Sequence, residues 1–511
     1  MEPSLRESSS PRLLVIVASL LLGALTWLAV DAIRSQLGEI PCFGDAWSIE
    51  LYAHGPRASV TPTPTTPKPG LIALHAALRS VDPPISPARA WQLLGALAVL
   101  LATLTAGLHG GLTGAVFAGL FLASWTPFLT GLLEIRAEVP LVVCLLASLL
   151  GASSLSPDKT SRIRAATGGM FLFLAGILRP EVWGVSAWLL LASVVRARHP
   201  AGGAQGKNLF WMGIIGIGAA PSWLLFDTLY FGSPTFSFQA TRLYAELAGF
   251  PLSPQAFPVL VDESAKLLSA AIERAAPGLL ILGLLGIGAL RPGVSRPLVM
   301  IVGGFFIAGA LALQFSGIPP FARFFDGFLA LVTVTAGALC GRFLGGRFLG
   351  GRFPGGHLLE GRSPGGSPDG RVAWAITLAV LVLVGLSAQS GLRRFAGQAR
   401  ASQAESHAFT TALSRETATT KGLILVDADL GSELVARAFI REEKLRNLQQ
   451  YLRRADPLDG VELIIIDDRH HAPPSGTSSH PRLAAFLGKC QEIYSNTARS
   501  IRILRLRPEG S

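Results

Sequence analysis

The stretch "LLVIVASLLLGALTWLAVDAI", residues 13–33, decides what kind of protein this is. It is almost entirely apolar, and it is as long as the roughly 20 residues that a helix needs to cross the hydrocarbon core of a bilayer. The run is longer than the apolar region of a typical signal peptide, and no clear small-residue cleavage site follows it. The stretch therefore predicts an uncleaved membrane-spanning helix.

The rest of the chain repeats this composition. Half of the 511 residues are apolar and only 15% are charged, which suits a protein that is solvated by lipid. Apolar blocks separated by basic or Pro/Gly-rich breaks predict an α-helical polytopic membrane protein with about eleven transmembrane helices. The predicted spans are residues 13–33, 90–108, 112–132, 138–153, 165–178, 182–195, 208–230, 277–290, 297–314, 326–341 and 372–391.

The basic residues predict how the chain is oriented. The formal net charge is +11, but much of this charge lies in alternate short loops between apolar blocks, a pattern typical of cytoplasmic loops and not of nucleic-acid binding. These loops hold Arg6, Arg12, Lys159, Arg162, Arg164, Arg196, Arg198, Lys207, Arg291, Arg296, Arg342, Arg347, Arg352, Arg362 and Arg371. We therefore expect a multi-pass protein of a bacterial-type inner membrane, with its N-terminus in the cytoplasm and its C-terminal tail outside.

The apolar blocks divide the chain into four segments. A transmembrane module is expected over residues 1–341, with long outer loops at 34–89 and 231–276. The next segment, 342–371, repeats Gly-Gly every five residues at its start and predicts a flexible basic linker in the cytoplasm. The last span, 372–391, leads to the fourth segment, a small extracytoplasmic α/β domain over residues 392–511.

The alternation of strand-like and helical segments in the tail predicts an α/β domain. The runs "GLILVDADLG", "VELIIIDDRHH" and "SIRILRLRP" read as strands, separated by one helical stretch that ends near Arg454 and by a second one before the last strand. Polar residues at the strand ends are candidates for holding a metal ion or phosphate, although such residues more often form caps and turns. They are Asp427, Asp429, Asp467, Asp468, His470 and His471.

Ionisable residues gather on the predicted outer face from four separate loops. Charged residues at membrane edges are often anchors or ion pairs, but their convergence on one face favours a substrate site. These residues are Asp45, Glu50, His54, Arg57, Lys68, Arg136, Glu138, Arg179, Glu181 and Arg323. The four cysteines show no CxxC or Cys/His spacing, so a zinc site is not expected.

Five segments, in this order, resemble the GT-C glycosyltransferases of the protein O-mannosyltransferase and aminoarabinose-transferase kind. They are "GDAWSIELYAHG" (44–55) with "TPKPGLIALHAAL" (66–78), "LLEIRAEVPLVVCLLASLL" (132–150), "FLAGILRPEVWGVSAWLLL" (173–191), "PSWLLFDTLYFGSPTFS" (221–237) and "PPFARFFDGFLALV" (319–332). Asp45-Ala46 stands where these relatives commonly have Asp-Glu, and Lys68-Pro69-Gly70 stands where they have Lys-Pro-Pro. The second outer loop offers Glu134 and Glu138 where many relatives carry Asp.

The resemblance implies a sugar transfer from a polyprenyl-phosphate carrier to an extracytoplasmic glycan, lipid or protein, with inversion at the anomeric carbon. The catalytic candidates are Asp45, a carboxylate that accepts the acceptor's proton, and Glu138, which would orient hydroxyl groups. The candidates for binding the donor phosphate are Lys68, Arg136, Arg179 and Arg323. Further candidates for substrate binding are Glu50, Tyr52, His54 and Glu181. No cofactor is implied with certainty, and the use of a divalent metal stays open.

Two other readings stay open. An inactive protein that shares the scaffold could keep Asp45 by chance. A lipid or sugar transporter would need ionisable groups near the bilayer midplane, where only Asp31 and Asp227 are candidates. Arg179 and Glu181 could also simply pair with each other.

Overall fold

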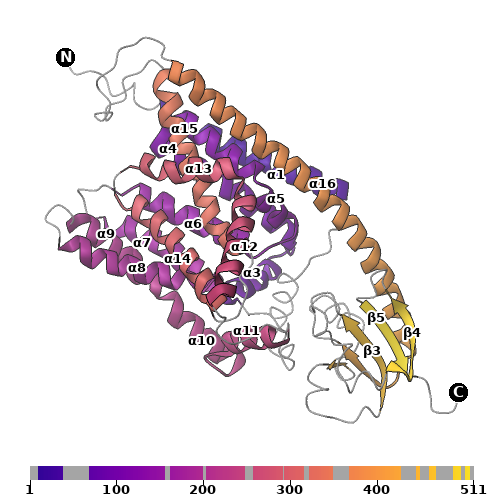
Figure 1. Ribbon diagram of the computed structural model, residues 1–511. Helices are drawn as coiled ribbons and strands as arrows, with labels where there is room; N and C mark the ends of the chain where they lie inside the picture. The colour runs from indigo at the N-terminus through magenta and orange to yellow at the C-terminus, as the bar shows by residue number, and fades with distance from the viewer. Residues whose placement is uncertain are drawn as a thin grey trace, which may run out of the picture.

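The computed structural model describes residues 10–37, 68–155, 161–198, 203–247, 257–291, 293–315, 322–348, 368–426, 445–448, 460–467, 487–495 and 501–506. Helices dominate it: they form one bundle, and a small sheet lies at the end of a long helix that runs along the bundle (Figure 1). The predicted class, an α-helical membrane protein with a small C-terminal α/β domain, is confirmed.

The helices of the bundle follow one another along the chain. They are α1 (Ser10–Leu37), α3 (Pro69–Ser80), α4 (Pro87–Ser124), α5 (Thr126–Leu133), α6 (Glu138–Ser153), α7 (Arg162–Leu178), α8 (Glu181–Ala197), α9 (Gly203–Ile217), α10 (Ala219–Phe231), α11 (Phe236–Leu247), α12 (Phe257–Ala275), α13 (Pro277–Gly286), η2 (Ile287–Ala289), α14 (Ser295–Phe315), η3 (Ala322–Phe325) and α15 (Asp326–Phe348). Every predicted span falls on one or two of these helices or on α16 (Pro368–Thr419). Because α15 reaches Phe348, the first residues of the predicted linker 342–371 are helical.

Six helices in the described residues are long and apolar enough to cross a membrane, and a bent pair, α12 with α13, would make a seventh. This count is lower than the eleven predicted spans for two reasons. The helices α6, α7 and α8 have only 16 or 17 residues each. In addition, α4 contains two of the predicted spans.

Helix α4 is a helical hairpin. Its backbone leaves the helical conformation at Gly111 (φ 64°, ψ −161°). After that turn the chain folds back on itself, so that a Cβ atom placed on Gly119 would lie 3.0 Å from Oγ1 of Thr103. The two limbs correspond to the separate spans predicted at 90–108 and 112–132, of which the second continues into α5.

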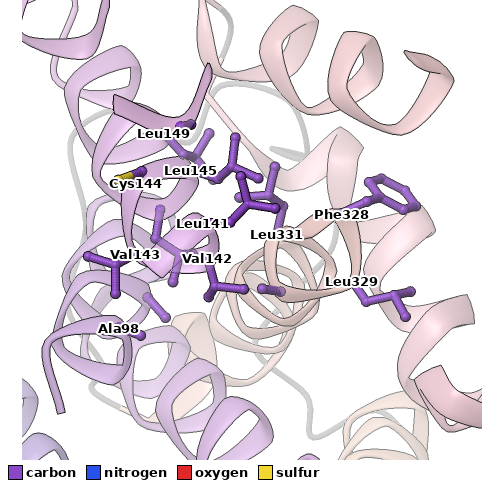
Figure 2. Close-up of a cluster of buried hydrophobic side chains, with 14 of the residues drawn as sticks. Ala98, Leu141, Val142, Val143, Cys144, Leu145, Leu149, Phe328, Leu329 and Leu331 are labelled. Carbon is purple, nitrogen blue, oxygen red and sulfur yellow. The ribbon is translucent and has the colours of Figure 1, made fainter. Parts of the chain in front are cut away.

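Helices α6 and α15 form the centre of the bundle. Leu141 and Leu145 of α6 point toward Leu331 of α15, and all three are buried (Figure 2). The helices approach closely at Gly327, where an added Cβ atom would lie 2.9 Å from Leu145 and 3.3 Å from Leu141. Large apolar side chains also cover the outside of the bundle: Leu13 and Leu28 of α1 are each 61% exposed. Apolar surface on both sides of a helix is expected where the outer side faces lipid.

Helix α16 joins the bundle to the sheet without a break. Its Val380 and Val384 pack in the bundle with Phe121 of α4, whereas its Phe409 and Leu413 pack on the sheet. At 1.5 Å per residue, its 52 residues extend for about 78 Å. The predicted boundary between the last span and the C-terminal domain, at residues 391 and 392, therefore lies inside a continuous helix.

The sheet has five strands in the order β2-β1-β3-β5-β4. Strands β1 (Leu423–Val426), β2 (Leu445–Asn447) and β3 (Val461–Asp467) are parallel, and β5 (Ile501–Leu506) pairs antiparallel with both β3 and β4 (Cys490–Ser495). The three strands predicted from sequence are β1, β3 and β5, which include the inner strands of the sheet. Their buried faces explain why these strands are the most apolar.

The helical prediction was wrong at β2 and β4. Both strands lie at the edges of the sheet, where one side of a strand has no neighbouring strand. Edge strands are commonly short and carry polar side chains, so they lack the apolar run or strict alternation that identifies a strand in sequence. "LRN" and "CQEIYS" fit this description.

Candidate functional site

A cluster of charged side chains forms where the ends of several helices meet at one end of the bundle. Glu138, Glu181 and Asp326 are the first residues of α6, α8 and α15. A helix N-terminus carries a partial positive charge and favours a carboxylate there. Arg179 directly follows the last residue of α7, and Arg274 lies in the last turn of α12, where a cation is favoured for the same reason. The helix ends therefore place acids and bases side by side.

Glu138 is at the centre of this cluster and is 4% exposed. Its Oε1 accepts a hydrogen bond from Nη2 of Arg179, and Nε of Arg323 lies 3.8 Å from the same oxygen. Arg179 also approaches Glu181, with 3.9 Å between Nη1 and Oε1. Two guanidinium groups from different segments thus face one carboxylate, and Arg179 bridges Glu138 and Glu181.

A second ion pair next to Glu138 was not predicted from sequence. Arg274 donates two hydrogen bonds to Asp326, from Nε at 2.6 Å and from Nη2 at 2.7 Å. The indole N–H of Trp125 donates to the backbone carbonyl of Arg274 at 2.7 Å. Glu138 is close enough to act electrostatically on both Arg274 and Asp326, so the two pairs belong to one network.

The backbone is strained at two places beside the cluster. Ile135 has φ 57° and Ala276 has φ 58°, and they are the non-glycine residues with positive φ in the described parts of the chain. Such conformations cost about 1–3 kcal/mol each and are concentrated at functional sites. Ile135 lies between Glu134 and Arg136, whose side chains form an ion pair across it.

Lys68 directly precedes α3. It is buried, and its carbonyl oxygen accepts hydrogen bonds from Leu71 and Ile72 in the first turn of that helix. Helix α3 packs tightly on the end of α7, since a Cβ atom on Gly70 would lie 3.1 Å from Leu178. This contact places the start of α3, which Lys68 precedes, against the end of α7, which Arg179 follows.

Of the predicted site residues, the structure brings Arg136, Glu138, Arg179, Glu181 and Arg323 together, and it places Lys68 directly before the neighbouring helix α3. Asp45, Glu50, Tyr52 and His54 lie outside the described residues, as do Asp427, Asp429, Asp468, His470 and His471 of the tail. Arg179 pairs with Glu138 as well as with Glu181, and the carboxylate of Asp326 is bound by Arg274. No group of three or more metal-ligating side chains was found in the parts of the chain that the structure describes.

His75 connects α3 to the cluster. Its ring and that of Trp91 are in an edge-to-face arrangement, with 5.4 Å between the ring centroids. The indole N–H of Trp91 donates to the backbone carbonyl of Arg136 at 2.7 Å. Burial lowers the pKa of His75 from 6.5 to about 4, because the charged imidazolium loses its hydration. His75 is therefore neutral at physiological pH.

Acid is expected to loosen this contact. The unfolded state binds the His75 proton more readily, so the stabilisation is complete above about pH 6.5 and is lost as the pH falls toward 4, by on the order of 3 kcal/mol. His75→Phe should flatten the dependence of the melting temperature on pH between 7.5 and 5. His407→Gln, which changes an exposed histidine on α16, should not. An unchanged slope in His75→Phe would contradict this assignment.

Solved structures of other proteins have a similar fold. ArnT from Cupriavidus metallidurans, solved with bound undecaprenyl phosphate, aligns over 96% of this chain and 97% of its own, with a TM-score of 0.57 and 12% identity. An oligosaccharyltransferase from Archaeoglobus fulgidus in the apo form aligns over 91% of this chain and 70% of its own, with a TM-score of 0.51 and 11% identity. The same enzyme tethered to an acceptor peptide containing the NVT sequon gives a TM-score of 0.53. No protein-family model and no curated protein matches the sequence.

The fold and the helices together define a multi-pass membrane protein whose helical bundle carries a small α/β domain. Its fold is similar to the folds of ArnT and the archaeal oligosaccharyltransferase, in agreement with the GT-C fold that the order of the sequence motifs predicted.

Proposed function

We propose that the protein is a membrane glycosyltransferase that moves a sugar from a polyprenyl-phosphate carrier to an acceptor on the extracytoplasmic side. The observation that carries this proposal is the meeting of Arg179 and Arg323 at the buried Glu138. Guanidinium groups bind phosphate oxygens through paired hydrogen bonds, and they stabilise the charge that a phosphate leaving group gains in the transition state.

Arg323 is the best-placed cation to bind the phosphate. Its side chain is 35% exposed, and its 3.8 Å approach to Glu138 is longer than a hydrogen bond. The exposed part of its side chain is therefore accessible to a ligand. Arg179 is more buried and is held by Glu138 and Glu181, so it would supply a fixed positive charge. Lys68 and Arg136 complete the proposed phosphate site.

The proposed reaction is a single in-line displacement. The acceptor hydroxyl or amine attacks the anomeric carbon as its proton passes to Asp45, and the bond to the carrier phosphate breaks with inversion at that carbon. Glu138 would orient hydroxyl groups of the sugar or the acceptor. Glu50, Tyr52, His54 and Glu181 are proposed to contact the sugar or the acceptor.

The location follows from the same proposal. In a bacterial-type inner membrane with the N-terminus in the cytoplasm, the charged cluster and the C-terminal sheet would both lie outside. The acceptor is then a glycan, lipid or protein of the cell envelope. Two other interpretations are an inactive protein on the same scaffold and a transporter of the lipid carrier or sugar. Unlike the enzyme, neither has a rate of sugar transfer that loss of Asp45 would lower.

Binding of the carrier gives the first test. Arg323→Gln should weaken the binding of undecaprenyl phosphate to the purified protein by about tenfold or more, because a charge-assisted contact is lost. Arg393→Gln removes the same charge from an exposed position on α16 and should change the dissociation constant by less than about twofold. Native mass spectrometry with titrated undecaprenyl phosphate measures both. Equal affinities for the two variants would remove Arg323 from the phosphate site.

A further inference from the structure

At the other end of the bundle, a second charged group forms around His109. Helices α6 and α15 both begin in the charged cluster; α6 ends here at Ser153, and α15 passes here at Arg342. At 1.5 Å per residue, Ser153 is about 22 Å from Glu138 along α6. This distance approaches the thickness of the hydrocarbon core of a bilayer, so the two charged groups lie near opposite surfaces of the membrane.

His109 fixes one arginine through the backbone. Its Nδ1 accepts a hydrogen bond from the backbone N–H of Arg291 at 3.0 Å. A neutral imidazole that accepts at Nδ1 carries its proton on Nε2, which lies 2.9 Å from Oγ of Ser153 and donates to it. His109 thereby ties the turn of α4 to the end of α6 and to the segment that follows η2.

A second arginine is held in place at the same segment. Arg296 donates from Nε to the carbonyl of Leu290 and from Nη2 to the carbonyl of Gly288, at 2.7 Å each. Its guanidinium group is therefore fixed beside the turn that carries Arg291.

The third arginine comes from α15. Gly341 packs directly on the turn of α4, since an added Cβ atom would lie only 2.2 Å from the carbonyl oxygen of Gly110. This contact holds Arg342, the next residue, beside His109. Residues far apart in sequence are thus held together by the packing of the helices.

The three arginines, here called the arginine cluster (Arg291, Arg296 and Arg342), repel one another. Each is close enough to act electrostatically on His109, and Arg291 and Arg296 act on Arg342. None of the three takes part in an ion pair among the described residues, and the side chains of Arg291 and Arg342 are exposed. Like charges held together by packing favour the binding of an anion.

We propose that the arginine cluster binds the phosphate group of an anionic membrane lipid. Its surroundings favour a lipid as the source of the phosphate: Leu285 of α13 and Met300 of α14, on either side of the turn, are 64% and 63% exposed and present apolar surface to lipid tails. Basic residues at the membrane surface attract anionic headgroups, and arginine binds phosphate through paired hydrogen bonds. This site is separate from the proposed transferase site.

The test measures binding of phosphatidylglycerol, phosphatidylcholine and inorganic phosphate to the protein in a neutral detergent. The double variant Arg291→Gln/Arg342→Gln should bind phosphatidylglycerol about tenfold or more weakly, with phosphatidylcholine unaffected. The matched control Arg198→Gln/Lys207→Gln removes two exposed charges at the same end of the bundle, one directly after α8 and one near the start of α9. It should stay within about twofold of the wild-type affinity, and the melting temperatures of all variants should agree.

Two results would overturn the proposal. If the two double variants lose the same affinity, the effect is general surface charge and not a site. If inorganic phosphate binds as tightly as the lipid and displaces it, the cluster binds a soluble anion and the lipid assignment is wrong.

Discussion

Asp45→Asn is expected to lower the rate of sugar transfer by about 10²-fold or more, because an amide of nearly the same shape cannot accept the proton of the acceptor. Binding of undecaprenyl phosphate should hardly change, since the proposed cations for the phosphate remain. This combination of unchanged binding with lost turnover is expected of an interaction made only in the transition state.

The measurement is the transfer rate of the purified protein with a polyprenyl-phosphate sugar, once comparison of envelope glycans and lipids with and without the gene has identified the sugar. Asp262→Asn is the matched control: it changes an exposed carboxylate on α12 and should keep the wild-type rate. A normal rate in Asp45→Asn would exclude Asp45 as the base. A wild-type protein that binds the carrier and transfers no sugar would favour the inactive scaffold or the transporter.

Breaking the ion pair between Arg274 and Asp326 is expected to cause the largest loss of stability. Asp326→Asn leaves the cation of Arg274 without its buried partner, and removal of one partner of a buried pair costs about 3–5 kcal/mol. Arg274→Met should cost a similar amount. The double variant Arg274→Met/Asp326→Leu should regain most of the stability, because no uncompensated charge is left.

The exposed pair of Lys266 and Asp262, one turn apart on α12, provides the control. Its double-mutant cycle should give a coupling of only about 0.5 kcal/mol. Unfolding free energies in detergent measure both cycles, and purely additive effects at Arg274 and Asp326 would contradict the prediction. The stable double variant should still transfer sugar slowly, because Arg274 and Asp326 fix the start of α15 and with it Arg323 beside Glu138.

The sequence predicts the location of most of the charged cluster. Apolar spans alternate in direction, so the loops of Arg136, Arg179 and Arg323 must all reach the same side of the membrane. The pairing of these residues could not be predicted in the same way. Asp326 lies three residues from Arg323 and 52 residues from Arg274, yet Arg274 binds it, because α12 packs against η3.

The positions of strained backbone are even harder to predict from the sequence than the ion pairs. Ile135 adopts a positive φ although a β-branched residue disfavours this conformation, so its residue type gives no signal for it. Edge strands such as β4 were missed because their polar side chains hide the strand pattern. The sequence therefore predicts well which segments lie in lipid and which lie in water. It predicts poorly the features that depend on contacts between distant segments.

Because α16 is continuous, it fixes the rotational orientation of the C-terminal domain about the axis of this helix. Gly391 meets Thr126 of the bundle, and Phe409 meets the sheet. At 3.6 residues per turn, the interval between them is about five full turns, so both contacts lie on the same side of the helix. The sheet is consequently turned toward the side on which the bundle lies, as Figure 1 shows. Deleting a single residue between these contacts would rotate the domain by about 100° about the helix axis. The number of residues in this rigid connection therefore determines the direction in which the domain faces.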